Sequence, residues 1–462
     1  MAIFNNSNSS TKNAGESYKE ILSFWWPELV SAAATFALPI ILDALIVCQL
    51  ESTSTYSALG VANNFLHTIT KLTEAFMVST IAFIGVFNGA KKYKEAGKAL
   101  GDAFWVTVIS GFFTFLLLFL FAENIYIWLG TPEQIAKIGA PFLRLRAFGV
   151  FLAFIYASLF GFMRAVKNTK TPMQILIIGI VIFLICDYTL VLGKFGFPQM
   201  RLSGSAVSSI IQNVVMIALA FWHILRNEEY KKYFDQMFFL NFNIKGFLHI
   251  LNLSWPIMID KTILASAYVF LNKMINPMGK YAIASFTVIK DMERLAFLPA
   301  VALATVITFL VSNNLGNNNP AGARSIMRKT LYLGGAMVFV ALLLMTVNAR
   351  FFVHLFDHKD KFTDFAVLAF PFISLFVIFD FIQLILCGAL RGAGDVKAVM
   401  VIRIIACYGF FYPLVTFISW LNIPSALVKF ILIYGSFYLH TGLIGLLCII
   451  RLKSKKLRSD KI

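Results

Sequence analysis

Twelve long apolar runs, separated by short polar segments, make up most of this chain. The first six lie near residues 24–48, 57–87, 102–122, 140–163, 173–193 and 203–225, and the second six lie near 248–277, 281–312, 330–349, 365–390, 398–420 and 426–450. A helix of about 20 apolar residues is long enough to cross the hydrocarbon core of a bilayer. The pattern predicts an all-α integral membrane protein with twelve transmembrane helices.

Short motifs recur between the two halves of the chain at a nearly constant spacing. Three repeated pairs share one spacing along the sequence: Gly89 with Gly316, Arg164 with Arg391, and Lys170 with Lys397. A fourth pair, Pro27 with Pro256, departs from this spacing only slightly. Repeated helical halves are typical of transporters, because two similar bundles can rock about a site held between them. The chain is therefore predicted to contain its own fold twice.

The apolar runs and the repeat together predict the domain boundaries. We expect a polar cytoplasmic tail at residues 1–23, a first six-helix lobe at 24–226 and a cytoplasmic linker at 227–247. A second six-helix lobe follows at 248–450, and a basic cytoplasmic tail at 451–462 ends the chain.

Composition excludes several classes of protein. The chain is 59% hydrophobic and only 14% charged, which is more apolar surface than a soluble core can bury. Its net charge of +17 comes from cations in short loops and not from a basic face, so nucleic-acid binding is not expected. The five cysteines lie inside apolar runs without metal-ligand spacing, so neither a metal site nor another cofactor is predicted.

The cations are gathered on one side of the predicted membrane. They fall in the loops after the second, fourth and eighth runs, in the linker and in the C-terminal tail, whereas the opposite-side loops around 123–133 and 420–425 carry almost none. Because loops rich in lysine and arginine stay in the cytoplasm, both termini are predicted to be cytoplasmic, in a multi-pass inner-membrane protein. Contact with anionic lipid is the simplest role for the basic tail.

At several places the chain resembles the multidrug and toxic compound extrusion (MATE) transporters. The resembling segments are Pro27 with Asp43, Asn88-Gly-Ala90, Arg164-Ala165 with Thr169-Lys-Thr-Pro-Met173, Asp187 with Gly196-Phe-Pro198 and Gly204, and Asp380-Phe-Ile-Gln383 running into Gly388-Ala-Leu-Arg-Gly392. Their order, spacing and repetition cover nearly the whole chain.

The resemblance implies a twelve-helix transporter whose two lobes alternate between inward and outward openings. It implies export of small organic, often cationic, compounds, driven by inward flow of protons or sodium. Some members of the family place coupling carboxylates in the first lobe, at positions that match Asp43 and Asp187. Others use a carboxylate in the tenth span, which Asp380 matches, so a sodium site at one of these three residues is also implied.

The chain departs from the family pattern at two places. Phe183 stands where an asparagine usually precedes the aspartate of the fifth span by four residues. The seventh span has no glutamate to pair with Asp380, and the acid it does contain, Asp260, lies at a different position relative to Pro256. The coupling ion therefore stays open between proton and sodium.

Asp43 and Asp187 are expected at similar depths in the first lobe. Asp43 follows Pro27 by 16 residues and Asp187 follows Pro172 by 15, which places both about 22–25 Å from the cytoplasmic end of their helices. Two neighbouring carboxylates in a low-dielectric lobe cannot both stay ionised cheaply, so one is expected to hold a proton. The simpler alternative is that each accepts structural hydrogen bonds, but acids inside a membrane usually face a cavity.

Charges in the second lobe have simpler explanations beside the functional one. Lys261 adjoins Asp260, and Arg403 lies in the eleventh run, so internal salt bridges explain Asp260 and Asp380 nearly as well as ion coupling does. Residues 290–294, Lys-Asp-Met-Glu-Arg, interrupt the eighth run and favour a solvated or self-paired turn over a gate. The Arg164 and Arg391 segments, with the lysines that follow them, are expected to reach lipid phosphates.

Three other functions compete with drug export: a lipid-linked saccharide flippase, a channel or scaffold, and a nutrient or nucleotide carrier of another twelve-helix family. The chain has no phosphate-binding loop of the Walker type and no zinc-protease motif, so neither a primary pump nor a membrane enzyme is expected. A lipid-linked saccharide flippase of the related superfamily would need several cations inside the lobes, whereas most cations here are at loop level. A channel or scaffold would tolerate loss of the embedded acids. We expect a monomer that binds small organic cations and membrane lipids.

Overall fold

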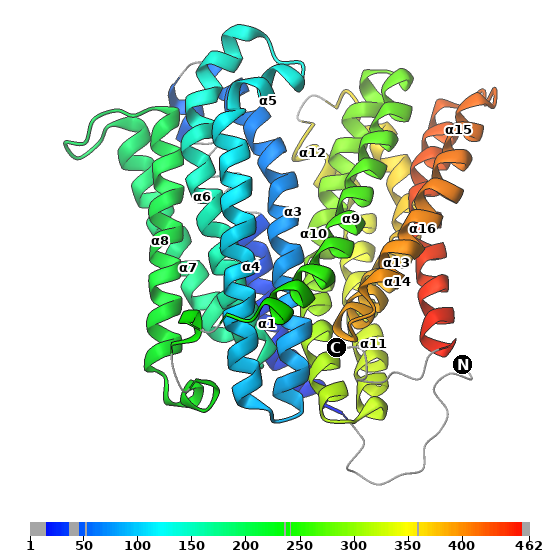
Figure 1. The fold of residues 1–462 in the computed structure, drawn as a ribbon. Coiled ribbons are helices and arrows are strands. Elements are labelled where there is room, and N and C mark those ends of the chain that lie inside the picture. Colours follow the sequence, from blue (N-terminus) through cyan, green and yellow to red (C-terminus); the bar gives the residue numbers. More distant parts are fainter. Residues whose placement is uncertain are drawn as a thin grey trace. The chain divides into compact units, whose positions relative to one another are not determined.

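The structure is a computed structural model that describes residues 15–36, 46–50, 53–234, 237–240, 242–357 and 360–454. Within these residues the chain is almost entirely helical and no strand is found (Figure 1). The long helices of the first half are α1 (Tyr18–Phe36), α3 (Thr53–Gly89), α4 (Tyr93–Leu120), α6 (Glu133–Ala165), α7 (Lys170–Leu192) and α8 (Leu202–Arg226). Those of the second half are α9 (Ile244–Ile275), α10 (Lys280–Gly316), α11 (Pro320–Val347), α13 (Thr363–Gly392), α14 (Val396–Ile404), α15 (Tyr412–Trp420) and α16 (Ala426–Ser454).

The predicted all-α membrane fold is confirmed. Ten helical spans in the described residues are long and apolar enough to cross a bilayer, one of them running through α14, a π-helical turn η6 (Ile405–Phe411) and α15. The first and seventh predicted spans correspond to α1, which runs up to undescribed residues, and to α9, a helix of 32 residues. Asp260 and Lys261 lower the mean hydropathy of α9.

Several helices begin earlier than the apolar runs that predicted them. Helix α4 begins at Tyr93 and not near 102, and α11 begins at Pro320 and not near 330. The early turns of both helices carry charged side chains, among them Lys94, Lys98 and Arg324. Such turns lie at the polar edge of a membrane, where hydropathy alone does not register them.

The sequence repeat extends to the helix boundaries. The first and last residues of α10 follow those of α3 at the same spacing that separates Arg391 from Arg164, and those of α11 follow those of α4 in the same way. Two short helices, α5 (Ala122–Trp128) and α12 (Ala349–His354), also begin at this spacing. The repeat therefore reproduces secondary structure as well as motifs.

The chain forms two compact units. One comprises residues 26–255, and the other comprises the N-terminal residues up to 25 together with 256–462. The chain passes from one unit to the other inside α1, after Trp25, and inside α9, after Trp255. Both passages fall at the repeated Trp-Pro motifs that contain Pro27 and Pro256.

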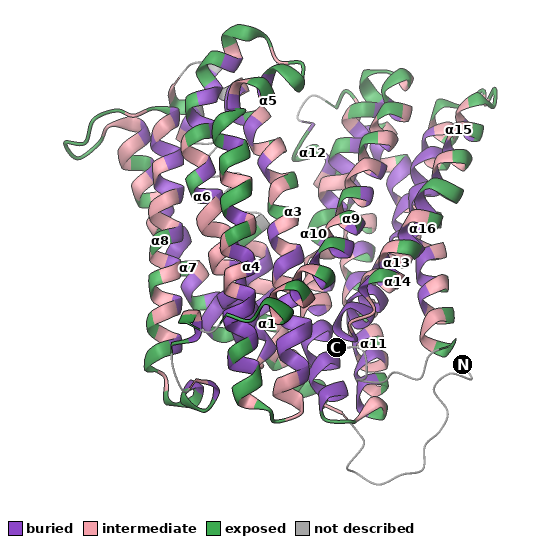
Figure 2. Ribbon diagram, in the orientation of Figure 1, coloured by how far each residue is buried: buried purple, intermediate pink, exposed green. Residues whose placement is uncertain are grey.

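One helix is central to the packing of each unit. In the first-half unit α6 packs against α3, α4 and α8, and in the second-half unit its repeat equivalent α13 packs against α10, α11 and α16. Exposed positions line the outward faces of the long helices (Figure 2) and include large apolar side chains such as Phe113, Leu117 and Phe372. An apolar belt of this kind is what a lipid bilayer covers.

The linker between the halves is folded onto the first-half unit. Its 3-10 turns are η3 (Glu228–Tyr233) and η4 (Phe238–Leu240). Tyr233 Oη donates to Asn88 Oδ1 at 2.6 Å, and Asn168 Nδ2 donates to Tyr230 Oη at 2.7 Å. Burial raises the pKa of Tyr230 to about 12, so this phenol stays protonated at neutral pH. Residues 227–234 are thus a packed element of the unit.

The start of α9 and the N-terminal segment are fixed in comparable ways. Asp102 Oδ1 of α4 accepts from the Asn243 backbone N–H at 2.8 Å, where α9 begins. In the second-half unit, Lys329 Nζ donates to the Glu16 carbonyl at 2.7 Å, and Asn314 Nδ2 donates to Glu16 Oε2 at 2.9 Å. The residues just before the first helix of each half are therefore anchored.

We predict that Gly97→Ala detaches the linker. A Cβ at Gly97 of α4 would overlap the Tyr233 carbonyl, and such overpacking costs about 1–3 kcal/mol. Tryptic cleavage at Lys231 and Lys232 should become roughly tenfold faster, since about 1.4 kcal/mol corresponds to a factor of ten. Gly60→Ala, in α3 with open space around it, is the control and should leave cleavage unchanged. Equal cleavage of the two variants would refute the docking of the linker.

Candidate ion-coupling site

The structure places the four predicted coupling acids differently. Asp43 lies outside the described residues. Asp187 is fully buried on α7 of the first-half unit, whereas Asp260 on α9 and Asp380 on α13 belong to the second-half unit. Asp260 is 1% exposed and Asp380 is half-buried. The second-half unit therefore brings two of the four acids into one bundle.

Asp260 is held by two arginines. Arg391 Nη2 of α13 donates to its Oδ2 at 2.5 Å, and Arg403 Nε of α14 donates to its Oδ1. All three side chains are almost completely buried. Two guanidiniums on one carboxylate keep Asp260 ionised, so the salt-bridge interpretation accounts for this residue.

A hydrogen-bonded chain joins this cluster to Asp380. Arg403 Nη2 donates to Gln383 Oε1 at 3.2 Å, and Gln383 Nε2 donates to Asp380 Oδ1 at 3.0 Å. Gln383 orients one oxygen of Asp380 without contributing a charge. Asp380 therefore has no direct ion pair with either arginine in the described network.

The repeated arginines are inside the protein, so the expectation that they reach lipid phosphates is wrong. Arg164 Nε donates to Glu28 Oε1 at 2.7 Å and Arg164 Nη1 approaches Met77 Sδ at 2.7 Å, with both charged side chains less than a tenth exposed. Arg391 does the same with Asp260. In each half, an arginine of the fourth helix thus forms an ion pair with an acid of the first helix. Lys170 and Lys397, by contrast, are exposed.

The other repeated residues occupy matching structural positions. Pro27 and Pro256 are buried inside α1 and α9, and Gly89 and Gly316 are the last residues of α3 and α10. A proline inside a helix supplies no backbone N–H and weakens the helix there. These residues lie at the ends of helices or inside them, where their role is structural.

A buried acid that the sequence did not single out, Glu293, lies in α10. The expected turn at residues 290–294 is wrong for this side chain, because α10 runs unbroken and Glu293 is 5% exposed. Its Oε2 accepts from Tyr434 Oη and from Tyr438 Oη, the latter at 2.5 Å. Its Oε1 has no hydrogen-bond partner among the described residues.

A sequence signal for this site does exist. Tyr434 and Tyr438 are four residues apart in the last apolar run, so they lie on one face of a helix. Paired phenols facing inward need an acceptor, and Glu293 is the acid embedded deepest in the eighth run. The charged neighbours Lys290, Asp291 and Arg294 concealed that signal.

Glu293 and Asp380 belong to one electrostatic cluster. Each interacts with the other and with the half-buried phenol of Tyr268 on α9. His440, on the helix that carries both tyrosines, contacts the Phe437 carbonyl and lies 4.9 Å from the Phe411 ring, as expected of a packing histidine. No group of three or more His, Cys, Asp or Glu side chains among the described residues is arranged to hold a metal ion.

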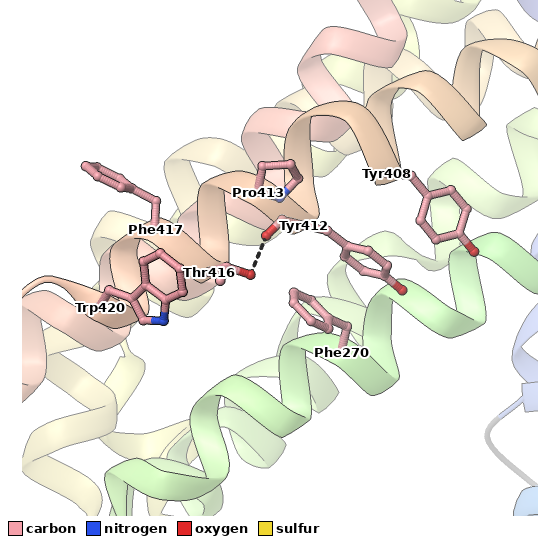
Figure 3. Close-up of a pocket in the computed structure, with 7 residues that line it drawn as sticks. All are labelled: Phe270, Tyr408, Tyr412, Pro413, Thr416, Phe417 and Trp420. Carbon is pink, nitrogen blue, oxygen red and sulfur yellow. Dashed lines mark hydrogen bonds between the residues drawn. The ribbon is translucent and has the colours of Figure 1, made fainter.

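An aromatic groove of about 480 Å³ lies in the same unit (Figure 3). Phe270 of α9 faces it from one side, and it is completed by Tyr408, Tyr412, Pro413, Thr416, Phe417 and Trp420. Ser266 Oγ lies 3.3 Å from Tyr408 Oη and accepts from Tyr412 Oη at 3.2 Å. The groove therefore presents the faces of aromatic rings, with the hydroxyls of Tyr408 and Tyr412 among its polar groups.

Comparison with known proteins gives consistent results. The MatE family profile matches residues 30–189 and 256–416. The probable multidrug resistance protein YoeA of Bacillus subtilis is 24% identical over 76% of this chain and 79% of its own length. The probable multidrug resistance protein NorM of Bacillus cereus ATCC 14579 is 22% identical over 89% of this chain and 91% of its own. A mutant of the Vibrio cholerae MATE transporter VcmN superposes with a TM-score of 0.86 at 18% identity, covering 95% of this chain and 98% of the other.

The arginine clamp gives a stability prediction. Asp260→Asn leaves two buried guanidiniums without their anion, and breaking a buried ion pair in this way costs about 3–5 kcal/mol. The variant should unfold at a clearly lower temperature in detergent. Asp364→Asn removes an exposed partner of Arg350 and is the matched control. Equal unfolding temperatures for the two variants would show that the clamp does not hold the unit together.

Proposed function

This chain belongs to the MatE family of multidrug transporters, and from that premise we propose that it exports small organic compounds in exchange for an inward-moving ion. The ion is a proton or sodium, and the protein transports without catalysing a chemical reaction. We place it in the inner membrane as a monomer with both termini in the cytoplasm.

One observation above all supports ion coupling. Glu293 and Asp380 are acids inside a membrane lobe, and no ion pair with a described cation neutralises either of them. Ionisable groups inside membrane proteins are costly to keep and usually mark ion or substrate pathways. The two buried arginines of the same unit, Arg391 and Arg403, are bound to Asp260, which leaves these two carboxyls able to exchange a cation with solution.

The repeat supports alternating access. Two structurally equivalent halves, each closed by its own arginine–acid pair, suit a mechanism in which the lobes move as bodies about a central site. In that mechanism the predicted lobes at 24–226 and 248–450 open in turn to the cytoplasm and to the outside. Bound ion and bound substrate favour different openings.

The aromatic groove supports organic cations as substrates. Phenylalanine, tyrosine and tryptophan faces attract a flat cation by about 0.5–2 kcal/mol each. Arg164, Arg391 and Arg403 are occupied by internal acids, so they are poorly placed to bind the anionic headgroup that a saccharide-lipid flippase would carry.

Inverted membrane vesicles test the proposed function directly. An imposed proton gradient, or separately an imposed sodium gradient, should drive accumulation of the fluorescent cation ethidium above that of vesicles lacking the protein. Accumulation driven by neither gradient would refute ion-coupled cation export and would move the assignment toward the lipid flippase.

Single substitutions test the acids. We predict that Asp380→Asn lowers gradient-driven ethidium accumulation at least about tenfold, because an amide cannot exchange a cation. Asp43→Asn and Asp187→Asn are predicted to abolish coupled export in the same way while leaving the protein folded. Asp364→Asn, at an exposed position, should transport normally. Retained export in the Asp380, Asp43 and Asp187 variants alike would contradict their assignment.

A further inference from the structure

We propose that Glu293 of α10 carries the coupling proton in the second half of this transporter, with Tyr434 and Tyr438 of α16 as positioning residues. The proposal rests on the proposed ion-coupled export and names the group and the ion. It assigns a role to a residue outside the acids that the family resemblance indicated.

The first step is the geometry of the tyrosine pair. Both hydroxyls donate to the same oxygen of Glu293, Oε2, and both phenols are almost fully buried. Two charge-assisted hydrogen bonds to one oxygen fix the carboxyl plane and stabilise its ionised form. The tyrosines come from adjacent turns of one helix, so the arrangement depends on α16 packing beside α10.

The other carboxyl oxygen of Glu293, Oε1, is where a proton can bind. Oε1 is buried and has no hydrogen-bond partner among the described residues. A buried carboxylate oxygen without a partner is costly, and binding a positive charge there removes that cost. The site is therefore complete with a cation bound at Oε1 and incomplete without one.

The third step favours a proton over sodium. Hard metal cations take several oxygen ligands at once. Glu293 offers one open oxygen, since Oε2 is already engaged, and the described residues contain no cluster of three or more acids, histidines or cysteines around it. One open oxygen is sufficient for one proton.

The groups facing Glu293 explain why the proton can leave. Asp380 from α13 supplies a second carboxyl, Tyr268 from α9 supplies a half-buried phenol, and the two tyrosines come from α16. On α10 itself, Arg294 is exposed, and Lys290 lies over the Phe286 ring, 5.6 Å from its centroid. From α14, Arg403 is bound to Asp260. No cation among these groups pairs with Glu293 in the described residues, and the two tyrosine donors remain in place for the carboxylate once the proton has left.

The transport step then balances in charge. A proton from the side of higher proton concentration binds Oε1 and forms the neutral acid. When the lobe opens to the other side, the proton leaves and the carboxylate returns to its two tyrosine hydrogen bonds. An organic cation bound in the aromatic groove favours the ionised acid, so cation binding and proton release are coupled, which gives exchange.

The decisive variant is Glu293→Gln, studied with the full chain in proteoliposomes. Glutamine has the same shape, and its amide oxygen still accepts from both tyrosines, but it cannot gain or lose a proton. We expect proton-driven ethidium accumulation to fall at least about tenfold, while ethidium exchange in the absence of any gradient persists. Glu133→Gln, an exposed glutamate paired with Lys137, is the matched control and should keep both activities.

The tyrosines are tested by Tyr434→Phe combined with Tyr438→Phe. Without the two donors the ionised carboxylate is less stabilised, so the pH profile of ethidium transport should move to higher pH with exchange retained. Tyr332→Phe, at an exposed tyrosine of α11, should not move the profile. An unmoved profile in the double variant would overturn the positioning role.

The outcomes separate this proposal from the proposed function. Full proton-driven accumulation by Glu293→Gln overturns the inference and leaves ion-coupled export standing. Accumulation by the unaltered protein that responds to sodium alone also overturns the inference, and again not the proposed function. Loss of both accumulation and exchange in Glu293→Gln would indicate a structural carboxyl and overturn the inference. Failure of the unaltered protein to respond to any gradient would overturn both.

Discussion

The cost of an unneutralised charge in the membrane organises both halves of this protein. Each half carries a buried arginine on its fourth helix, and each arginine ends on a carboxylate of the first helix of that half, Arg164 on Glu28 and Arg391 on Asp260. The pairs connect helices far apart in sequence and fix the packing of each bundle. The second half adds Arg403 to the same carboxylate, so Asp260 is paired with two cations.

The positions of the two arginines are repeated between the halves more strictly than the positions of the acids that pair with them. Glu28 directly follows Pro27, whereas Asp260 lies about one helical turn beyond Pro256. That shift brings Asp260 within reach of Arg403 and, through Gln383, of Asp380. The second half therefore contains three acids of two kinds: Asp260 is paired with two arginines, whereas Glu293 and Asp380 have hydrogen bonds but no ion pair with a described cation.

The apolar runs and the repeat were enough to predict the fold class and the span order, because membrane crossing requires long apolar helices. Helix ends were misjudged where charged turns extend α4 and α11 past the apolar core. The burial of Arg164 and Arg391 could not be predicted, because an arginine beside a loop looks the same in sequence whether it snorkels or pairs. Glu293 was missed because its charged neighbours in the sequence masked it, and only its contacts with α16 distinguish it from them.

The central claim is that the Glu293 carboxyl binds a proton that an organic cation displaces. Proton release on adding ethidium to the purified protein in weakly buffered detergent, followed with a pH indicator, tests this without transport. The account predicts release of about one proton per bound cation by the unaltered protein and almost none by Glu293→Gln with ethidium still bound. Equal release by both proteins would contradict it.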